Sequence, residues 1–199
     1  MNDKFFDLKR EKQDRMINGG LKVFARNGYR HASTDEIVRE AGISKGLLFH
    51  YFISKVGMYT FLIDYSVRFL SLEISRTVRK EEENYWEICK QIEFAKLQIL
   101  KKYPYMNAFL ERVFVEFCEE AWPEAVRQKH YYRRKIEECF DSVGEHPFGE
   151  GVDTGKVKGL VRYTVRGIEQ EALLQEEILP EDIYSQVCQY LDFMKGVWR

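Results

Sequence analysis

The sequence 33-STDEIVREAGISKGLLFHYFISK-55 carries the clearest structural signals in the amino-terminal part of this chain. Its first half places Ser33 and Glu36 at the spacing of a helix capping box, and apolar residues follow at helical intervals. Gly42 ends this short helix, because glycine accepts the left-handed conformation found at helix termini. Ser44 is an N-cap for a second short helix. The stretch therefore predicts two short helices joined by a tight turn.

The rest of the chain is also predicted to be helical, which gives an all-α fold. Apolar residues recur at three- and four-residue intervals, strand-like alternation is scarce, and the 4 prolines interrupt no strongly periodic segment. Besides the pair above, we expect helices over about 8–26, 54–78, 84–102, 105–119, 123–143, 153–178 and 181–197. The glycine-rich segment 144–153 is the clearest loop.

The composition is that of an ordinary globular protein. The 199 residues are 45% hydrophobic and 32% charged, and no apolar run approaches the roughly 18 residues that a membrane span needs. The charged start of the sequence suggests neither a signal peptide nor a transit peptide. We therefore expect a cytoplasmic protein.

The sequence offers no catalytic or metal-binding constellation. Cys89, Cys118, Cys139 and Cys188 are widely separated and have no histidine at ligand spacing, so buried thiols are favoured over a zinc site or a disulfide framework. No phosphate-binding glycine loop, HExxH motif or nucleophile elbow is present. We expect no metal, no cofactor and no enzymatic activity.

The charge is distributed unevenly along the chain. Residues 1–57 hold 11 Lys and Arg against 7 Asp and Glu, a net +4, whereas the remainder holds 20 against 25, a net −5. The basic part contains the opening stretch. This asymmetry favours an anionic partner for the amino-terminal part.

The paired short helices follow a longer first helix, an arrangement typical of helix-turn-helix domains. Such a pair exposes its second helix, whose amino-terminal residues can enter the DNA major groove. An ordinary corner in a helical bundle has the same spacing. DNA binding is favoured over such a corner by Ser44, Lys45 and Gly46 at the start of the second helix. Backbone amides and a lysine there suit phosphate or guanine, and Gly46 permits close approach to another surface.

The span 34-TDEIVREAGISKGLLFHYFISK-55 closely resembles the amino-terminal domain of the TetR family of bacterial transcriptional regulators. The pattern of that family reads approximately T-x-x-I-A-x-x-A-G-V-S-x-G-x-L-Y-x-Y-F-x-S-K. Its matches here are Thr34, Ile37, Ala41, Gly42, Ser44, Gly46, Leu48, Tyr51, Phe52, Ser54 and Lys55.

The resemblance, which covers roughly residues 10–57, implies two domains and a function. Residues 1–55 would form a helix-turn-helix DNA-binding domain, and residues 56–199 a helical ligand-binding and dimerisation domain. A family member is expected to bind a palindromic operator in double-stranded DNA as a homodimer. It usually acts as a repressor that a small molecule releases.

The resemblance also assigns DNA contacts by position. Thr34 would touch phosphate, while the expected contacts on the second helix and after it are Ser44, Lys45, Gly46, Leu47, Phe49, His50, Tyr51 and Lys55. Position 49 is commonly tyrosine, so Phe49 lacks a hydroxyl for phosphate and its contact with DNA stays open. Leu47 replaces a frequent threonine and suits a thymine methyl group. Tyr51 can alternatively belong to the core, and His50 can be solvated.

The last two helices are expected to form the dimer interface, because they do so in the family that the chain resembles. The alternative is ordinary intramolecular core. The predicted interface residues are Val157, Gly159, Leu160, Thr164, Gly167, Ile168, Ile183, Val187, Tyr190, Leu191 and Met194.

The middle of the chain is rich in large apolar side chains that can line a pocket. The candidate ligand contacts are Phe94, Leu97, Phe109, Val113, Phe114, Phe117, Cys118, Tyr131, Tyr163 and Arg166. Simple core packing is the alternative for each of them. A ligand there should be largely apolar, with any anionic end facing Arg166.

A second class of function also fits the sequence. The unusual Phe49 and Leu47 are compatible with a helical small-molecule carrier or adaptor that has lost operator binding. The identity of the effector, the operator sequence, the regulated genes and the choice between repression and activation do not follow from these residues.

Overall fold

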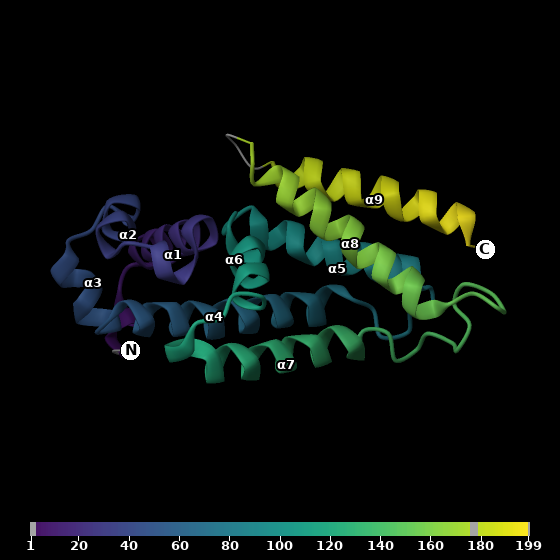
Figure 1. Cartoon of the computed structure of the whole chain (residues 1–199), viewed down its shortest axis with the longest axis horizontal. Helices are drawn as coiled ribbons and strands as arrows, with labels where there is room; N and C mark the ends of the chain where they lie inside the picture. The colour runs from purple at the N-terminus through teal and green to yellow at the C-terminus, as the bar shows by residue number, and fades with distance from the viewer. Residues whose placement is uncertain (1–2, 176–178, 199) are drawn as a thin grey trace. The chain divides into compact units, whose positions relative to one another are not determined.

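The computed structural model describes residues 3–175 and 179–198, and in this part of the chain it contains helices and no β-strand (Figure 1). The all-α prediction is confirmed. The elements are η1 (Asp3–Asp7), α1 (Arg10–His31), α2 (Thr34–Ala41), α3 (Lys45–Phe52), α4 (Lys55–Thr77), α5 (Tyr85–Leu100), α6 (Met106–Val113), η2 (Glu119–Ala121), α7 (Trp122–Glu138), α8 (Thr154–Ala172) and α9 (Pro180–Val197). The chain divides into two compact units.

The first unit comprises Met1–Phe69 and Lys102–Tyr132, and its centre is α1. This helix packs against α2 and α6. Gly20 allows a close approach to α4, since a Cβ atom there would lie 2.5 Å from Met58 Cε and 2.7 Å from Leu62 Cδ1. Packing on α1 thus positions α2, the first of the two short helices in the predicted DNA-binding segment.

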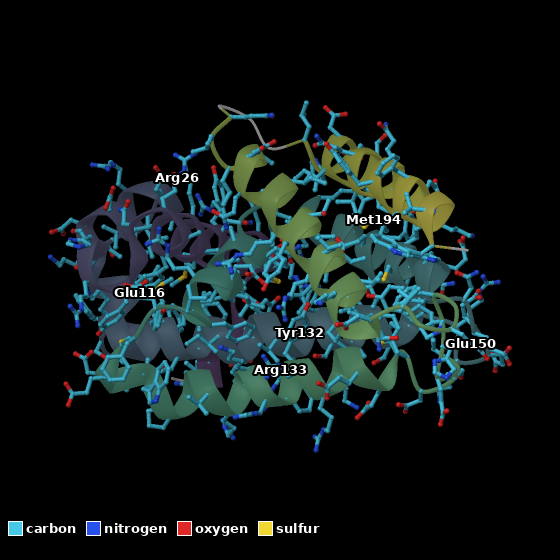
Figure 2. The ribbon with its side chains drawn as sticks, turned by 45° about the vertical axis from the view of Figure 1, so that its right-hand side comes forward. Arg26, Glu116, Tyr132, Arg133, Glu150 and Met194 are labelled. Atoms are coloured by element: carbon cyan, nitrogen blue, oxygen red, sulfur yellow. The ribbon has the colours of Figure 1, made fainter. Side chains whose placement is uncertain are left out.

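Polar contacts reinforce the first unit. The hydroxyl of Tyr103, a fully buried side chain, donates to Asp14 Oδ1 at 2.6 Å and lies 2.9 Å from the hydroxyl of Tyr65. Burial, together with these hydrogen bonds, raises the pKa of Tyr103. Arg26, labelled in Figure 2, donates to the hydroxyl of Tyr105 at 2.9 Å. These bonds attach α1 to the segment that precedes α6.

The amino-terminal element η1 contributes to the core of the first unit. Phe5 is 0% exposed, and its ring lies 5.8 Å from that of Tyr51, 5.2 Å from that of Phe52 and 5.2 Å from that of Phe61. Gln13 Nε2 donates to two carbonyls of the same segment, Phe6 O at 3.1 Å and Leu8 O at 2.8 Å. The segment before α1 therefore packs against α3 and the start of α4.

The second unit comprises Leu70–Lys101 and Arg133–Arg199, and in it α9 packs on α5 and α8. Its core includes Met194 of α9, which is labelled in Figure 2. Ion pairs at the edge join α5 to α9: Lys90 Nζ lies 2.6 Å from Asp192 Oδ1, and Lys195 Nζ lies 3.0 Å from Glu87 Oε1. Apolar burial and peripheral ion pairs together hold these helices.

The observed helix bounds differ from the predicted ones in the second half of the chain. The helix expected over 105–119 ends at Val113, where the carbonyl of Phe114 accepts a hydrogen bond from Lys129 Nζ at 2.7 Å. α7 ends at Glu138 rather than at residue 143. α8 ends at Ala172, and residues 176–178 of the helix expected over 153–178 lie outside the described residues.

Within the described ranges, no single helix is long and apolar enough to cross a membrane. One pair, α3 with α4, meets the length and composition criteria when its helices are taken together, and it is bent by 62° at the break between them.

Candidate nucleic-acid interface

The turn between α2 and α3 has the local structure that the sequence predicts. Gly42 adopts the left-handed conformation with φ of 60°. The hydroxyl of Ser44 accepts a hydrogen bond from Leu47 N at 3.2 Å, and that of Ser33 accepts one from Asp35 N at 3.2 Å. In the expected capping box the Glu36 carboxylate would accept a hydrogen bond from the backbone amide of Ser33. It instead accepts one from Asn27 Nδ2 at 2.9 Å. This bond fixes α2 to α1.

One side of α3 is buried. Leu48 is 0% exposed and Phe52 is 1% exposed, so both side chains belong to the core and anchor the helix. Tyr51 is 8% exposed and packs against Phe5, so the structure supports the core alternative for this residue. The buried side packs Phe52 against Phe5 of η1 and Phe61 of α4, which leaves the other side of α3 to solvent.

The opposite side and the amino-terminal end of α3 are accessible. Ser44, Lys45, Gly46 and His50 are exposed, while Leu47, Phe49 and Thr34 of α2 are partly exposed. A Cβ atom on Gly46 would meet no other atom within 4 Å, so the space in front of this residue is open. This accessible surface carries a lysine, a glycine and an apolar side chain, which suits a helix that enters the major groove.

Lys45 is paired on this surface. Its Nζ donates to Asp35 Oδ1 at 2.8 Å, which links the first turn of α3 to the first turn of α2. Both side chains are largely exposed, 51% for Lys45 and 72% for Asp35. Sequence spacing gave no sign of this pair, because it depends on how the turn brings the two helix starts together.

Lys55 has structural contacts in the DNA-free protein. Its Nζ donates to the carbonyl of Tyr29 at 2.9 Å and to that of Ala32 at 3.2 Å, and it lies 4.4 Å from the centre of the Tyr29 ring. The lysine thereby satisfies carbonyls at the end of α1. The family resemblance also implies that Lys55 contacts DNA. This contact stays a prediction, separate from the structural role.

Ile53 is a feature of the interface that the sequence analysis did not identify. It follows α3 with φ of 66° and is 73% exposed. A β-branched residue is strained in this left-handed region, and backbone strain of this kind is frequent at functional sites. The strain results from the sharp turn into α4, where Ser54 Oγ accepts a bond from Gly57 N at 3.0 Å.

The candidate ligand residues belong to both units. Phe109, Val113 and Cys118 of the first unit and Leu97 of the second are buried, which fits core packing as well as a ligand contact. The remaining six are half-buried or exposed: Phe114, Phe117 and Tyr131 in the first unit, and Phe94, Tyr163 and Arg166 in the second.

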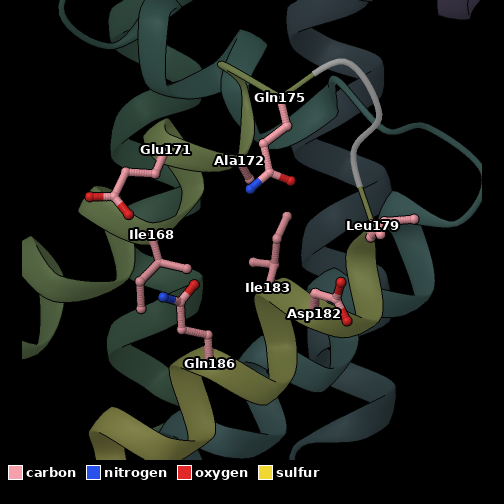
Figure 3. Close-up of a pocket in the computed structure, with 8 residues that line it drawn as sticks. All are labelled: Ile168, Glu171, Ala172, Gln175, Leu179, Asp182, Ile183 and Gln186. Carbon is pink, nitrogen blue, oxygen red and sulfur yellow. The ribbon is translucent and has the colours of Figure 1, made fainter.

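A pocket of about 110 Å³ lies in the second unit where α8 ends and α9 begins (Figure 3). Its lining residues are Ile168, Glu171, Ala172, Gln175, Leu179, Asp182, Ile183 and Gln186. None of the ten candidate ligand residues lines it. Its volume is below the roughly 300 to 1,000 Å³ of ordinary small-molecule sites, so it does not define an effector site.

The predicted dimer-interface residues fall into two groups. Six of them are buried inside the second unit: Val157, Ile168, Ile183, Val187, Leu191 and Met194. The other five, Gly159, Leu160, Thr164, Gly167 and Tyr190, are partly or fully exposed. Large exposed side chains that the prediction omitted are Tyr163 of α8, 64% exposed, and Phe193 and Val197 of α9, 70% and 58% exposed.

Comparison with known sequences agrees with the geometry of this surface. Residues 16–60 match the family model described as "Bacterial regulatory proteins, tetR family". The HTH-type transcriptional regulator YerO of Bacillus subtilis (strain 168) is 23% identical over 146 residues, which are 72% of this chain and 49% of YerO. YuxN of the same organism, also an HTH-type transcriptional regulator, is 39% identical over 56 residues, 28% of this chain and 19% of YuxN. The matches thus span about half or less of these relatives.

Solved structures share the fold. A TetR family transcriptional regulator from Chloroflexus aurantiacus J-10-FL superposes with a TM-score of 0.64 at 16% identity, covering 99% of this chain and 95% of that one. PfmR from Thermus thermophilus gives 0.65 at 15% identity, with coverages of 92% and 94%. FadR from Bacillus subtilis in complex with stearoyl-CoA gives 0.57 at 15% identity, with coverages of 89% and 96%. Residues 16–60, which contain the helix-turn-helix described above, thus match the tetR family model, and the described part of the chain has the fold of solved TetR family regulators.

Proposed function

We propose that this chain is a transcriptional regulator of the tetR family, a homodimeric repressor that binds a palindromic operator and is released by a small, largely apolar molecule. The observation that carries DNA binding is the two-sided character of α3. Leu48 and Phe52 anchor one side, whereas Ser44, Lys45 and Gly46 present an open amino-terminal end. Such an end can approach base edges and phosphates in the major groove.

Selection of bound sequences from a randomised DNA library tests this proposal. The selected DNA should contain two inverted half-sites, because a two-fold symmetric dimer presents two copies of α3. Binding should also weaken steeply with salt, since phosphate contacts release counterions. Absence of any enriched sequence and of salt-sensitive binding would instead support a carrier or adaptor without operator binding.

The exposed apolar side chains of α8 and α9 support dimerisation through these helices. Leu160 and Tyr163 of α8 are 47% and 64% exposed, and Tyr190 and Phe193 of α9 are 46% and 70% exposed. Large apolar groups in such positions are typical of oligomer interfaces. The proposed interface therefore uses the exposed side of each helix, with Val197 added, while the six buried predicted residues support it from within.

Sedimentation tests the interface. Leu160→Glu together with Phe193→Glu should convert a dimer into a monomer at micromolar concentration, because two charges per subunit would be buried without partners. Leu72→Glu is the matched control, since Leu72 of α4 is 50% exposed and lies outside the proposed interface. A monomeric wild-type protein, or an intact dimer in the double variant, would contradict the proposed interface.

The effector is proposed to be largely apolar because the candidate ligand residues are mostly large apolar groups. The structurally similar FadR of Bacillus subtilis was solved with stearoyl-CoA, which makes long-chain acyl thioesters a first class to test. A ligand weakens operator binding only to the extent that it prefers the subunit arrangement that does not fit DNA.

Operator titrations with and without stearoyl-CoA, using free coenzyme A as control, test this effector class. The class is supported if the acyl thioester alone weakens binding, and it is excluded if both compounds leave the operator affinity unchanged. Further apolar compounds can be compared in the same assay.

A further inference from the structure

The ion pair between Asp35 and Lys45 brings a hydrogen-bond acceptor next to a donor on the exposed surface of the helix-turn-helix. Lys45 is the first residue of α3 and Asp35 is the second residue of α2, and their charged atoms lie 2.8 Å apart. Asp35 also follows Thr34, the residue expected to touch phosphate. The carboxylate therefore lies where DNA would approach.

The pair is too exposed to act mainly as a stabilising contact. The Asp35 side chain is 72% exposed and that of Lys45 is 51% exposed, and ion pairs in such positions contribute little to folding. A carboxylate close to the DNA backbone also repels phosphate, so Asp35 weakens binding to DNA of any sequence. An acidic residue in this position needs a compensating contact in the complex with the correct DNA.

The major-groove edge of a G·C pair supplies that contact. Guanine presents the acceptors O6 and N7, and cytosine presents the N4 amino donor beside them. A lysine suits guanine and a carboxylate accepts from cytosine N4. Resting on the proposed DNA-binding function, we propose that Asp35 determines specificity: with Lys45 it forms a donor and acceptor pair that selects one G·C base pair in each half-site.

Asp35 acts in two ways in this proposal. It holds the Lys45 ammonium near the exposed surface of α3 in the free protein. It also disfavours base pairs whose major-groove amino group lies elsewhere, as in an A·T pair that replaces G·C, where the amino group is on the purine. Removing the carboxylate should therefore raise the affinity for random DNA and lower the preference for the selected G·C pair. These opposite changes separate a specificity residue from one that only supports α2.

The experiment uses the full chain and operators selected with the wild-type protein. Each base pair of the half-site is replaced in turn, and binding is titrated for wild type, Asp35→Ala, Lys45→Met and the double variant. For the wild type, one G·C→A·T replacement should cost about tenfold or more in affinity. For Asp35→Ala, the same replacement should cost less than about threefold, while random DNA is bound more tightly. The double variant should lose little more preference than either single variant, because both residues act on one base pair.

Glu40→Gln is the matched control. Glu40 is also a carboxylate of α2 paired with a lysine, Lys22, at 2.6 Å, but that lysine lies on α1. The control should keep the wild-type preference at every base pair. Circular dichroism establishes that each variant is folded.

The inference is overturned if Asp35→Ala keeps the full wild-type preference at every G·C pair, or if it weakens selected and random DNA by the same factor. Either result leaves DNA binding by the chain intact. By contrast, if the wild-type protein selects no DNA sequence, the proposed function fails, and the inference fails with it.

Discussion

The residues of α3 divide by the side of the helix they occupy, and this division determines what a substitution can change. Leu48 and Phe52 are buried, so changing them alters the position of the helix. Gly46 and Lys45 are exposed, so changing them alters the surface offered to DNA without disturbing the core. Phe49 is partly exposed, which leaves its ring available for sugar or a thymine methyl group.

Gly46→Ala should separate stability from DNA binding. The added Cβ meets no protein atom within 4 Å, and alanine favours the helix by up to about 1 kcal/mol over glycine. We expect an unchanged or slightly higher free energy of unfolding and a tenfold or greater loss of operator affinity, because a methyl group would enter the space needed for close approach. Urea denaturation and a binding titration measure the two quantities. An unchanged affinity would show that DNA does not approach this residue closely.

Lys55→Met should lower the free energy of unfolding even without DNA. The substitution removes two charge-assisted hydrogen bonds to the carbonyls of Tyr29 and Ala32, while the apolar stem is kept. The expected loss is about 1 to 3 kcal/mol. Urea denaturation checks it, with Lys45→Met as the exposed control that should stay within about 0.5 kcal/mol of the wild type. Equal stability of the wild type and Lys55→Met would contradict the structural role.

At the scale of elements, the sequence predicts those features that depend on local chemistry. The turn at Gly42, the cap at Ser44 and the buried residues of α3 follow from residue type and spacing, and the structure contains them. Features that depend on distant contacts were missed. Two adjacent phenylalanines in a charged segment give no periodicity, so η1 could not be inferred, and the end of α6 depends on Lys129 of α7.

The faces of α8 and α9 are a second case in which the sequence does not determine the packing. Both helices carry apolar residues on more than one face, as Val157 and Leu160 illustrate. Periodicity identifies such stripes but does not tell which one faces the core of its own chain. The predicted dimer interface therefore combined residues from both.

Phe5→Ala should weaken the support of α3 by η1. The side chain is fully buried against Tyr51, Phe52 and Phe61, and truncating a buried phenylalanine costs about 3 to 5 kcal/mol. We expect a loss near the lower limit, because the segment can detach, and a weaker operator affinity. Phe6→Ala is the adjacent control, since Phe6 is 53% exposed. Similar unfolding midpoints for both variants would exclude a supporting role for Phe5.

The pair of α1 and α2 should respond to acid through Glu40. The hydrogen bond from Lys22 lowers the pKa of Glu40 below its ordinary value. A carboxyl whose pKa is lowered by folding adds stability above its unfolded pKa, near 4.3, and this stability is lost as the pH falls through the folded value.

Lys22→Met should therefore cost about 0.2 to 1 kcal/mol at pH 7, the range of exposed ion pairs, and less at about pH 3. Urea denaturation at both pH values measures the difference, and Glu40→Gln should behave in the same way. A cost of Lys22→Met that is equal at both pH values would show that the pair does not contribute through its charge.

At the scale of the whole molecule, the proposed function assigns DNA binding to the first unit and self-association to the exposed sides of α8 and α9 in the second unit. Residues 16–60 match the tetR family model, and the described part of the chain shares the fold of solved TetR family regulators. Its operator, dimer and effector are proposals that rest on exposed residues of α3, α8 and α9 and on the apolar candidate ligand residues. α4 begins at Lys55, three residues after the end of α3 at Phe52, so it is the proposed route by which an effector acts on DNA binding.

The central claim, that α3 binds DNA in a sequence-specific way, is tested by a titration of wild type and Lys45→Ala against the selected operator and random DNA at several salt concentrations. The account predicts nanomolar, salt-sensitive operator binding by the wild type, and a loss for Lys45→Ala that is larger on the operator than on random DNA. Equal losses on both DNAs would contradict the role of Lys45 in sequence recognition, and wild-type binding without any preference for the operator would contradict the central claim.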